Sequence, residues 1–190
     1  VRLHWSQCER VCGWARRSLD PAARCGWAAR VGEPDGVHAV PSAHLKLISP
    51  LCRMVEASEN LTRLDVSGGD LGPAGAALLA SSLRHNRRVR ELDLGTVAVD
   101  GSSRALGAAG AGISREGGVA IAKSLRSEHC KLTSLDLSYN YVKAEGGIAI
   151  AEALRSEHCK LTSLDLQDNG FAPDDRGFEP KSLPPWVQLL

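Results

Sequence analysis

The amino-acid sequence predicts an α/β solenoid, with parallel strands on its concave face and helices on its convex face. Three observations carry this prediction: a long internal repeat, an alternating apolar pattern in the first part of each unit, and a helical spacing of apolar residues in the second part. Because one strand–helix unit cannot bury its own apolar stripe, successive units must stack on one another.

The repeat is clearest in two identical stretches of sequence. The segment from Leu125 to Leu137 reads LRSEHCKLTSLDL, and the segment from Leu154 to Leu166 has the same letters one repeat later (154 − 125 = 29). Two shorter copies, which begin at Leu61 and Val89, have nearly the same offset (89 − 61 = 28). A common period therefore fixes the register of four units.

The first part of each unit follows the pattern L-x-x-L-x-L, in which apolar and polar residues alternate as they do in a half-buried strand. Parallel strands, neighbouring in chain order, are expected near residues 62–66, 90–94, 133–137 and 162–166.

The second part of each unit places small or apolar residues four positions apart, which is one stripe of a helix. The stripes are Gly75, Leu79 and Leu83; Gly117, Ile121 and Leu125; and Gly146, Ile150 and Leu154. Helices are expected near residues 46–56, 74–84, 117–127 and 146–156, the first belonging to a preceding, partly lost repeat. The side chains expected to be nearly fully buried in the core are Leu135, Leu137, Ile150, Leu154, Leu161, Leu164 and Leu166. The glycine at the head of each stripe is expected to let the helix approach the strand layer closely.

The combined motif, L-x-x-L-x-L-x-x-N-x-Φ followed by G-x-x-x-Φ-x-x-x-L, resembles the ribonuclease-inhibitor-like class of leucine-rich repeats. The same class is found in immune receptors of the nucleotide-binding oligomerisation type and in the Ran GTPase-activating protein. The resemblance covers about residues 45–172 and implies a leucine-rich-repeat solenoid. Asn140 and Asn169 match the family's asparagine, whose side chain satisfies backbone groups in the turn after the strand. Gly69 and Val97 stand at the equivalent positions, so those two turns must find other partners or be looser.

The repeat also divides the chain. Residues 45–172 form the predicted leucine-rich-repeat domain, with an insertion near 95–115, because Leu94 and Gly117 stand much farther apart than the equivalent Leu137 and Gly146. Residues 1–44 are a poorly defined N-terminal segment and a candidate cap, and residues 173–190 form a C-terminal tail and a second candidate cap. The chain begins with Val1 rather than methionine, which is expected of a fragment or of an imperfectly delimited gene.

The composition narrows the class of protein. A chain with 43% hydrophobic and 24% charged residues fits an ordinary soluble protein, and a net charge of +1 gives no reason to expect nucleic acid or an acidic membrane as partner. No apolar run approaches the ~18 residues needed to span a bilayer. Six cysteines without a secretion signal predict reduced thiols and a cytoplasmic location.

The candidate binding site is the concave strand face. Residues between the leucines point away from the core, and stacking the units aligns the aspartates Asp65, Asp93, Asp136 and Asp165. Because neighbouring strands lie about 4.8 Å apart, this column of like charges repels itself, and a basic protein partner would relieve the repulsion. The alternative interpretation is that aspartate is a favoured letter of the repeat and is simply solvated. Two columns flank the aspartates: Arg63, Glu91, Ser134 and Ser163, and Ser67, Gly95, Ser138 and Gln167.

Other motifs point less clearly to chemistry. The pairs His129-Cys130 and His158-Cys159 mimic a zinc site, but a cysteine before the strand is expected to point inward as a small buried group, with its histidine outward. The stretch Gly107 to Gly112 lacks the pattern of a phosphate-binding loop and is expected to be a surface loop. A basic cluster at Arg84–Arg90 is expected to be a solvated turn, with phosphate or an acidic partner as the alternative.

These observations predict a protein–protein interaction module that binds through its concave strand face and adjoining loops. No catalytic set, metal site or cofactor is expected, and the protein is not expected to be an enzyme. The resemblance leaves two alternatives open: a GTPase-activating regulator of a small GTPase, or a fragment of a larger immune-type sensor. The side chains that the Ran GTPase-activating protein needs for its activity find no match here, so none is carried over.

Overall fold

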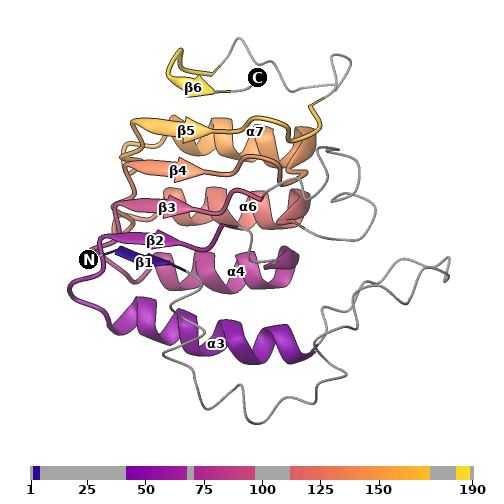
Figure 1. The fold of residues 1–190 in the computed structure, drawn as a ribbon. Helices are drawn as coiled ribbons and strands as arrows, with labels where there is room; N and C mark the ends of the chain where they lie inside the picture. Colours follow the sequence, from indigo (N-terminus) through magenta and orange to yellow (C-terminus); the bar gives the residue numbers. More distant parts are fainter. Residues whose placement is uncertain (1, 5–41, 68–70, 97–111, 172–182, 189–190) are drawn as a thin grey trace, which may run out of the picture.

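The computed structural model describes residues 2–4, 42–67, 71–96, 112–171 and 183–188 of the chain (Figure 1). Strands and helices alternate along this part of the sequence. In chain order the elements are β1 (Arg2–His4), α3 (Ser42–Ala57), β2 (Arg63–Asp65), α4 (Gly72–Leu83), β3 (Glu91–Asp93), α6 (Ser114–Leu125), β4 (Ser134–Asp136), α7 (Lys143–Leu154), β5 (Ser163–Asp165) and β6 (Val187–Gln188).

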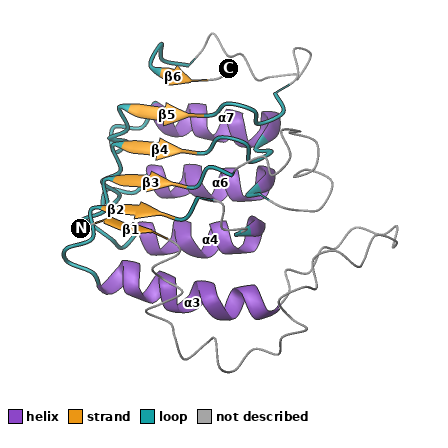
Figure 2. Ribbon diagram, viewed as in Figure 1, coloured by secondary structure: helices purple, strands orange, loops and turns teal. Residues whose placement is uncertain are grey.

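The strands form one six-stranded parallel sheet in the order β1-β2-β3-β4-β5-β6. They stack on one side of the molecule, and the helices form a second layer behind them (Figure 1; Figure 2). The predicted α/β solenoid of parallel strands and outer helices is therefore confirmed.

All four predicted strands occur inside their expected ranges, and they are neighbours in the expected order. All four predicted helices also occur, but each begins a few residues earlier than expected. The reason is that the apolar residue at the helix start, such as Ile113 or Val142, is itself buried in the core, so the helix begins right after it. The glycine of each stripe marks the first buried turn rather than the first helical residue.

The core follows the repeated leucine pattern. Leu135, Leu137, Ile150, Leu164 and Leu166 are at most 1% exposed, as predicted, and Leu161 is 7% exposed. The expectation for Leu154 was wrong, because this side chain is only partly buried. The equivalent Leu125, covered by α7, is 2% exposed, whereas no described helix follows α7 to cover Leu154.

The helix glycines are explained by crowding. A Cβ atom added to Gly117 would lie 2.1 Å from Cγ2 of Ile113 and 2.9 Å from Cβ of Ala76 on α4. A Cβ atom on Gly146 would lie 2.4 Å from Cγ1 of Val142. The glycines therefore make room for the apolar residue at the helix start and for the neighbouring helix, rather than mainly for the strand layer that the sequence suggested.

The two family asparagines tie successive units together. Asn140 is fully buried; its amide donates to the carbonyl oxygens of Leu94 (2.8 Å) and Ser138 (2.9 Å), and its carbonyl accepts from the N–H of Ile113 (3.2 Å). Asn169 makes the same type of bonds one unit later, to Leu137, Gln167, Asn140 and Val142. The expected role of these asparagines is confirmed. Gly69 and Val97, which stand at the equivalent positions of the two earlier turns, fall in residues 68–70 and 97–111, which lie outside the described residues.

The turns before the helices hold several residues in the left-handed region. Lys143 is exposed and has φ 52°, and the equivalent position in the unit of α4 is Gly72, with φ 58°. We expect Lys143→Gly to raise the free energy of unfolding by about 0.5–1 kcal/mol, because a left-handed residue with a Cβ is strained by roughly 1–2 kcal/mol and glycine loses part of that gain through its greater freedom when unfolded. Urea denaturation measures the change. Lys143→Ala keeps the strain and should bring no gain; an equal gain in both variants would contradict the explanation.

Short segments extend the sheet at both ends. Strand β1 pairs with β2, with Leu3 aligned to Leu64, and β6 pairs with β5, with Val187 aligned to Leu164. Leu183, near the C-terminus, packs against Ala144 of α7. Of the two candidate caps, residues 1, 5–41, 173–182 and 189–190 lie outside the described residues.

Candidate functional site

The predicted aspartate column lies in register on four neighbouring strands. The strand pairings align Asp65 with Asp93, Asp93 with Asp136, and Asp136 with Asp165. The members differ in exposure, because Asp65 is only 3% exposed and the other three are half-buried. The surface charge of the column therefore comes from Asp93, Asp136 and Asp165.

Each aspartate also closes the turn that follows its strand. The side-chain oxygen accepts a hydrogen bond from the backbone N–H two residues later, at 3.2 Å for Asp65, 3.1 Å for Asp93, 2.8 Å for Asp136 and 2.9 Å for Asp165. A short polar side chain that bonds to its own turn in this way stabilises the turn locally. This bond gives the recurrent aspartate a structural reason that the sequence pattern alone did not reveal.

The environment of the column opposes the charge on two of its members. Burial raises the pKa of Asp93 and of Asp165, and the neighbouring carboxylate of Asp136 raises both further, while the bond from the backbone N–H lowers them. A carboxyl whose pKa is raised by folding opposes the folded state at neutral pH, and this opposition disappears when the group is protonated. A cation placed against the column would remove part of the same repulsion.

The flanking column combines opposite charges with small polar residues. Arg63 on β2 donates to Glu91 on β3 at 2.9 Å, and both side chains are partly exposed. Serines continue this column on β4 and β5. On the other flank, a Cβ atom on Gly95 would lie 2.9 Å from Oγ of Ser138 and 3.1 Å from Oδ1 of Asp136, so glycine permits close packing there.

An aromatic surface lies where the strands end, and sequence reasoning missed it. Three of the four aromatic side chains that the structure describes lie in the turns after β4 and β5: Tyr139, Tyr141 and Phe171. The fourth, Trp186, lies just before β6. The signal available in the sequence was that the two tyrosines flank Asn140 in a chain with only 4% aromatic residues.

Both tyrosines adopt left-handed backbone conformations. Tyr139 has φ 59° and Tyr141 has φ 55°, whereas Asp168 and Gly170 hold the equivalent positions one unit later. Aspartate and glycine adopt this conformation more readily than tyrosine does. Tyr139 also hydrogen-bonds Asp168, which raises the pKa of the phenol. The backbone of this turn therefore does not favour tyrosine, and its aromatic rings call for another explanation.

The insertion begins and ends beside these tyrosines. The N–H of Thr96 donates to the carbonyl oxygen of Ser138 at 3.1 Å, and its hydroxyl donates to the carbonyl oxygen of Tyr139. On the returning side, the N–H of Ser114 donates to the carbonyl oxygen of Asn140 at 3.1 Å. Both ends of the insertion are thus attached to the turn after β4, while residues 97–111, with the glycine-rich stretch, lie outside the described residues.

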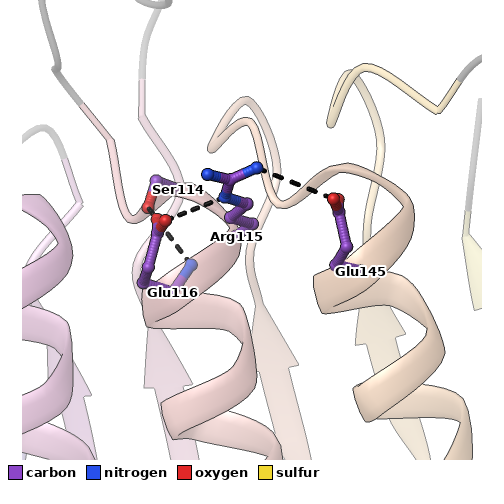
Figure 3. A network of polar contacts seen from close by, with 4 residues as sticks. All are labelled: Ser114, Arg115, Glu116 and Glu145. Atoms are coloured by element: carbon purple, nitrogen blue, oxygen red, sulfur yellow. Dashed lines mark hydrogen bonds and ion pairs between the residues drawn. The ribbon is translucent and has the colours of Figure 1, made fainter. Parts of the chain in front are cut away.

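A charged network at the start of α6 and α7 borders the same turns (Figure 3). Nε of Arg115 lies 2.8 Å from Oε1 of Glu116, and its Nη1 lies 3.6 Å from Oε1 of Glu145. Arg115, together with Ser114 and a backbone N–H, holds the pKa of Glu116 at about 2. Because these side chains are more than half exposed, the ion pairs contribute little to stability, and the network chiefly adds charge to this edge.

In both histidine–cysteine pairs the cysteine is more buried than the histidine beside it. Cys130 is buried and Cys159 is half-buried, and both are free thiols. His129 and His158 lie near the carboxylates of Glu128 and Glu157, at 3.6 and 3.7 Å. Among the described residues, no group of three or more side chains is arranged to hold a metal ion.

The two cysteines provide a matched pair for a labelling experiment. We expect iodoacetamide to modify Cys159 faster than Cys130, because Cys130 is only 3% exposed. Burial raises the pKa of both thiols, so both should react more slowly at neutral pH than a free cysteine, and faster as the pH rises. Mass spectrometry after cleavage at glutamate separates the two sites, which trypsin would release as the same peptide. Equal rates at the two sites would contradict the assigned burial.

The fold and the stacked strand face define a repeat protein of the strand–helix solenoid class. A family model described as Leucine Rich repeat matches residues 57–80, 128–151 and 157–175. These three matches support a leucine-rich repeat protein. No curated protein matches the chain. None of the described helices is long and apolar enough to cross a membrane.

Proposed function

We propose that this chain is a protein-binding module that holds its partner on the concave strand face and on the turns that follow β4 and β5. Leucine-rich repeats generally mediate protein–protein interaction and are typically not enzymes, which supports the class of function. The main support for this binding face is the in-register column of Asp93, Asp136 and Asp165. The tyrosines of the turn after β4 follow Asp136 closely in the sequence.

The chemistry of this face favours a partner that presents lysine or arginine. Three half-buried carboxylates one strand apart repel one another, and the raised pKa values of Asp93 and Asp165 express that repulsion together with burial. A cation between them would be attracted by all three, and an aromatic ring beside it adds a favourable cation–π contact. Aromatic residues are also enriched among the residues that dominate binding energy at protein interfaces.

We further place the chain in the ribonuclease-inhibitor-like class and in a reducing, cytoplasmic compartment. The length of the repeat and the full helix that follows each of β2, β3 and β4 support the subclass. The free thiols of Cys52, Cys130 and Cys159 are compatible with the compartment.

The charge of the column can be tested without damaging the fold. Asp136→Asn combined with Asp165→Asn removes two charges but keeps the side-chain oxygens that accept the backbone N–H bonds. For a partner captured with the parent protein, we expect the association rate constant to fall roughly three- to tenfold at low salt, because charges steer the encounter. Surface plasmon resonance at several salt concentrations measures this, and the double variant should also show a weaker salt dependence.

Two further measurements make this experiment decisive. Binding by the parent should weaken as the pH falls through the pKa values of Asp93 and Asp165, because protonation removes the charge that attracts the partner. Glu152→Gln combined with Glu157→Gln removes two exposed carboxylates outside the strand face and should leave the association rate nearly unchanged. If both double variants slowed association equally, the aspartates would act only through the net charge of the protein and would not mark the binding surface.

A further inference from the structure

A second charged surface lies on the edge of the molecule opposite the tyrosines. The turns that lead from each helix into the next strand gather along one edge, at the left in Figure 2. We call the last three of these turns, residues 84–90, 126–131 and 155–160, the basic edge. Its cations are Arg84, Arg87, Arg88, Arg90, Arg126, Lys131, Arg155 and Lys160.

The positive charge of this edge is not neutralised within the part of the chain that the structure describes. None of the eight cations forms an ion pair with a described carboxylate. Nζ of Lys131 and Nζ of Lys160 donate instead to the backbone carbonyl oxygens of Glu128 (2.6 Å) and Glu157 (2.9 Å), and Arg90 also donates to carbonyl oxygens. Hydrogen bonds to carbonyls leave the full charge of each cation in place.

Carboxylates near this edge are few. Within the three turns they are Glu128 and Glu157, each beside the histidine of its own turn. Outside them, Glu59 lies in the earlier turn before β2, and Glu91, which follows Arg90, pairs with Arg63. Eight cations against the two carboxylates of the three turns leave a strong positive excess along the edge, although the whole chain has a net charge of only +1. The strand face and the opposite edge carry acidic groups that offset this excess.

The most basic of these turns is rigid. Asn86 is 4% exposed; its amide donates to the carbonyl oxygen of Val55 at 2.5 Å, and its carbonyl accepts from the N–H groups of Arg88 at 2.7 Å and Val89 at 2.8 Å. The buried amide fixes the turn against α3, and the side chains of Arg87 and Arg88 are exposed on it. Holding the charged turn in place before binding reduces the entropy lost on binding.

From these observations we propose that the basic edge binds an acidic polypeptide segment that runs across the helix-to-strand turns. Arginine recognises carboxylates through paired N–H donors, and the three turns offer cations at successive levels of the solenoid. With helices spaced about 9 Å apart, the edge spans roughly 20 Å, which about six residues of an extended chain would cross.

Two features favour a protein over a nucleic acid. The three turns of the basic edge contain no tryptophan, tyrosine or phenylalanine on which unpaired bases stack, and Trp186 lies outside these turns, just before β6. The aspartate column begins within one short strand of these turns and would repel a long, uniformly charged polyanion. A short acidic segment can lie along the edge without meeting the column.

The probe for this proposal is a fluorescein-labelled peptide of about twelve alternating glutamate and glycine residues, long enough to cross all three turns. We expect fluorescence anisotropy to show binding that weakens with added salt. Arg87→Glu combined with Arg88→Glu should weaken the Kd by roughly tenfold or more, because both guanidiniums are replaced by repelling carboxylates. The thermal midpoint should stay close to that of the parent, because neither side chain makes a described bond.

The control is Arg115→Glu combined with Lys143→Glu, which changes the net charge equally at exposed positions at the starts of α6 and α7, at the opposite edge. It should change the Kd by less than about threefold. Equal losses in the two double variants, or no binding of the peptide at low salt, would overturn the proposal. Tighter binding of a single-stranded oligonucleotide of similar length, lost in the Arg87 and Arg88 variant, would also overturn it in favour of nucleic acid.

Discussion

Replacing Asn140 by alanine should lower the free energy of unfolding by about 3–4 kcal/mol, because it leaves two buried backbone groups without a partner. The carbonyl oxygen of Leu94 and the N–H of Ile113 both bond to this side chain, at 2.8 and 3.2 Å. Each unsatisfied buried group costs about 1–3 kcal/mol. The carbonyl oxygen of Ser138 keeps its bond from Thr96 and should contribute less. Urea denaturation followed by circular dichroism measures the loss.

The matched control for this substitution is Gln167→Ala, which truncates a partly exposed amide in the next unit. It should change the free energy of unfolding by less than about 0.5 kcal/mol. Asn169→Ala, which removes equivalent bonds from a residue that is 1% exposed, should have an effect as large as Asn140→Ala. A loss below about 1 kcal/mol for both asparagines would show that water or a shifted backbone replaces these bonds.

The duplicated segment places two leucines, Leu125 and Leu154, at equivalent positions of two successive units, so that the effect of burial can be compared in the same local sequence. Leu125→Ala should lower the free energy of unfolding by about 2–5 kcal/mol, because the side chain is 2% exposed and its removal leaves a cavity. Leu154→Ala should cost only about 1–2 kcal/mol, because its side chain is already partly exposed and the remaining site can relax. Thermal and urea denaturation of the two variants provide the comparison.

The residues that follow these two leucines are identical as far as Leu137 and Leu166, so the variants differ mainly in what covers them. Equal losses would mean that Leu154 is covered as completely as Leu125. A larger loss for Leu154→Ala would contradict the order of burial in the solenoid.

Most of the fold could be predicted because its local and long-range signals agree. The alternation in L-x-x-L-x-L and the four-residue spacing after it both repeat at a fixed period, so each strand and helix was supported by several copies. The burial of Leu154 was overestimated because a repeat pattern does not record which unit is last. The short strands β1 and β6 lack the motif, and only their pairing with β2 and β5 makes them strands.

The sequence predicted which residues of the candidate site line up across the strands, but it did not predict their burial or their hydrogen bonds. The register of the aspartates followed from the period, whereas the near-complete burial of Asp65 and the bonds to the turn depend on the path of the backbone. The role of Asn86 was invisible for the same reason, since its main partner is the carbonyl oxygen of Val55 on the preceding helix. The tyrosines were overlooked because the family motif specifies Asn140 and leaves its two neighbours free.

The proposed binding surface is tested most directly by removing its two tyrosines in a way that the turn tolerates. Tyr139→Asn and Tyr141→Gly place residues that adopt the left-handed conformation readily, and Gly170 already stands at the second position one unit later. The measurement is the Kd of a partner captured with the parent protein, with the thermal midpoint of the double variant as control. We predict a Kd weaker by roughly tenfold or more at an unchanged or higher thermal midpoint, as expected when aromatic contacts are lost from an interface. An unchanged Kd for a stably folded double variant would contradict the account and move the binding surface away from the ends of strands β4 and β5.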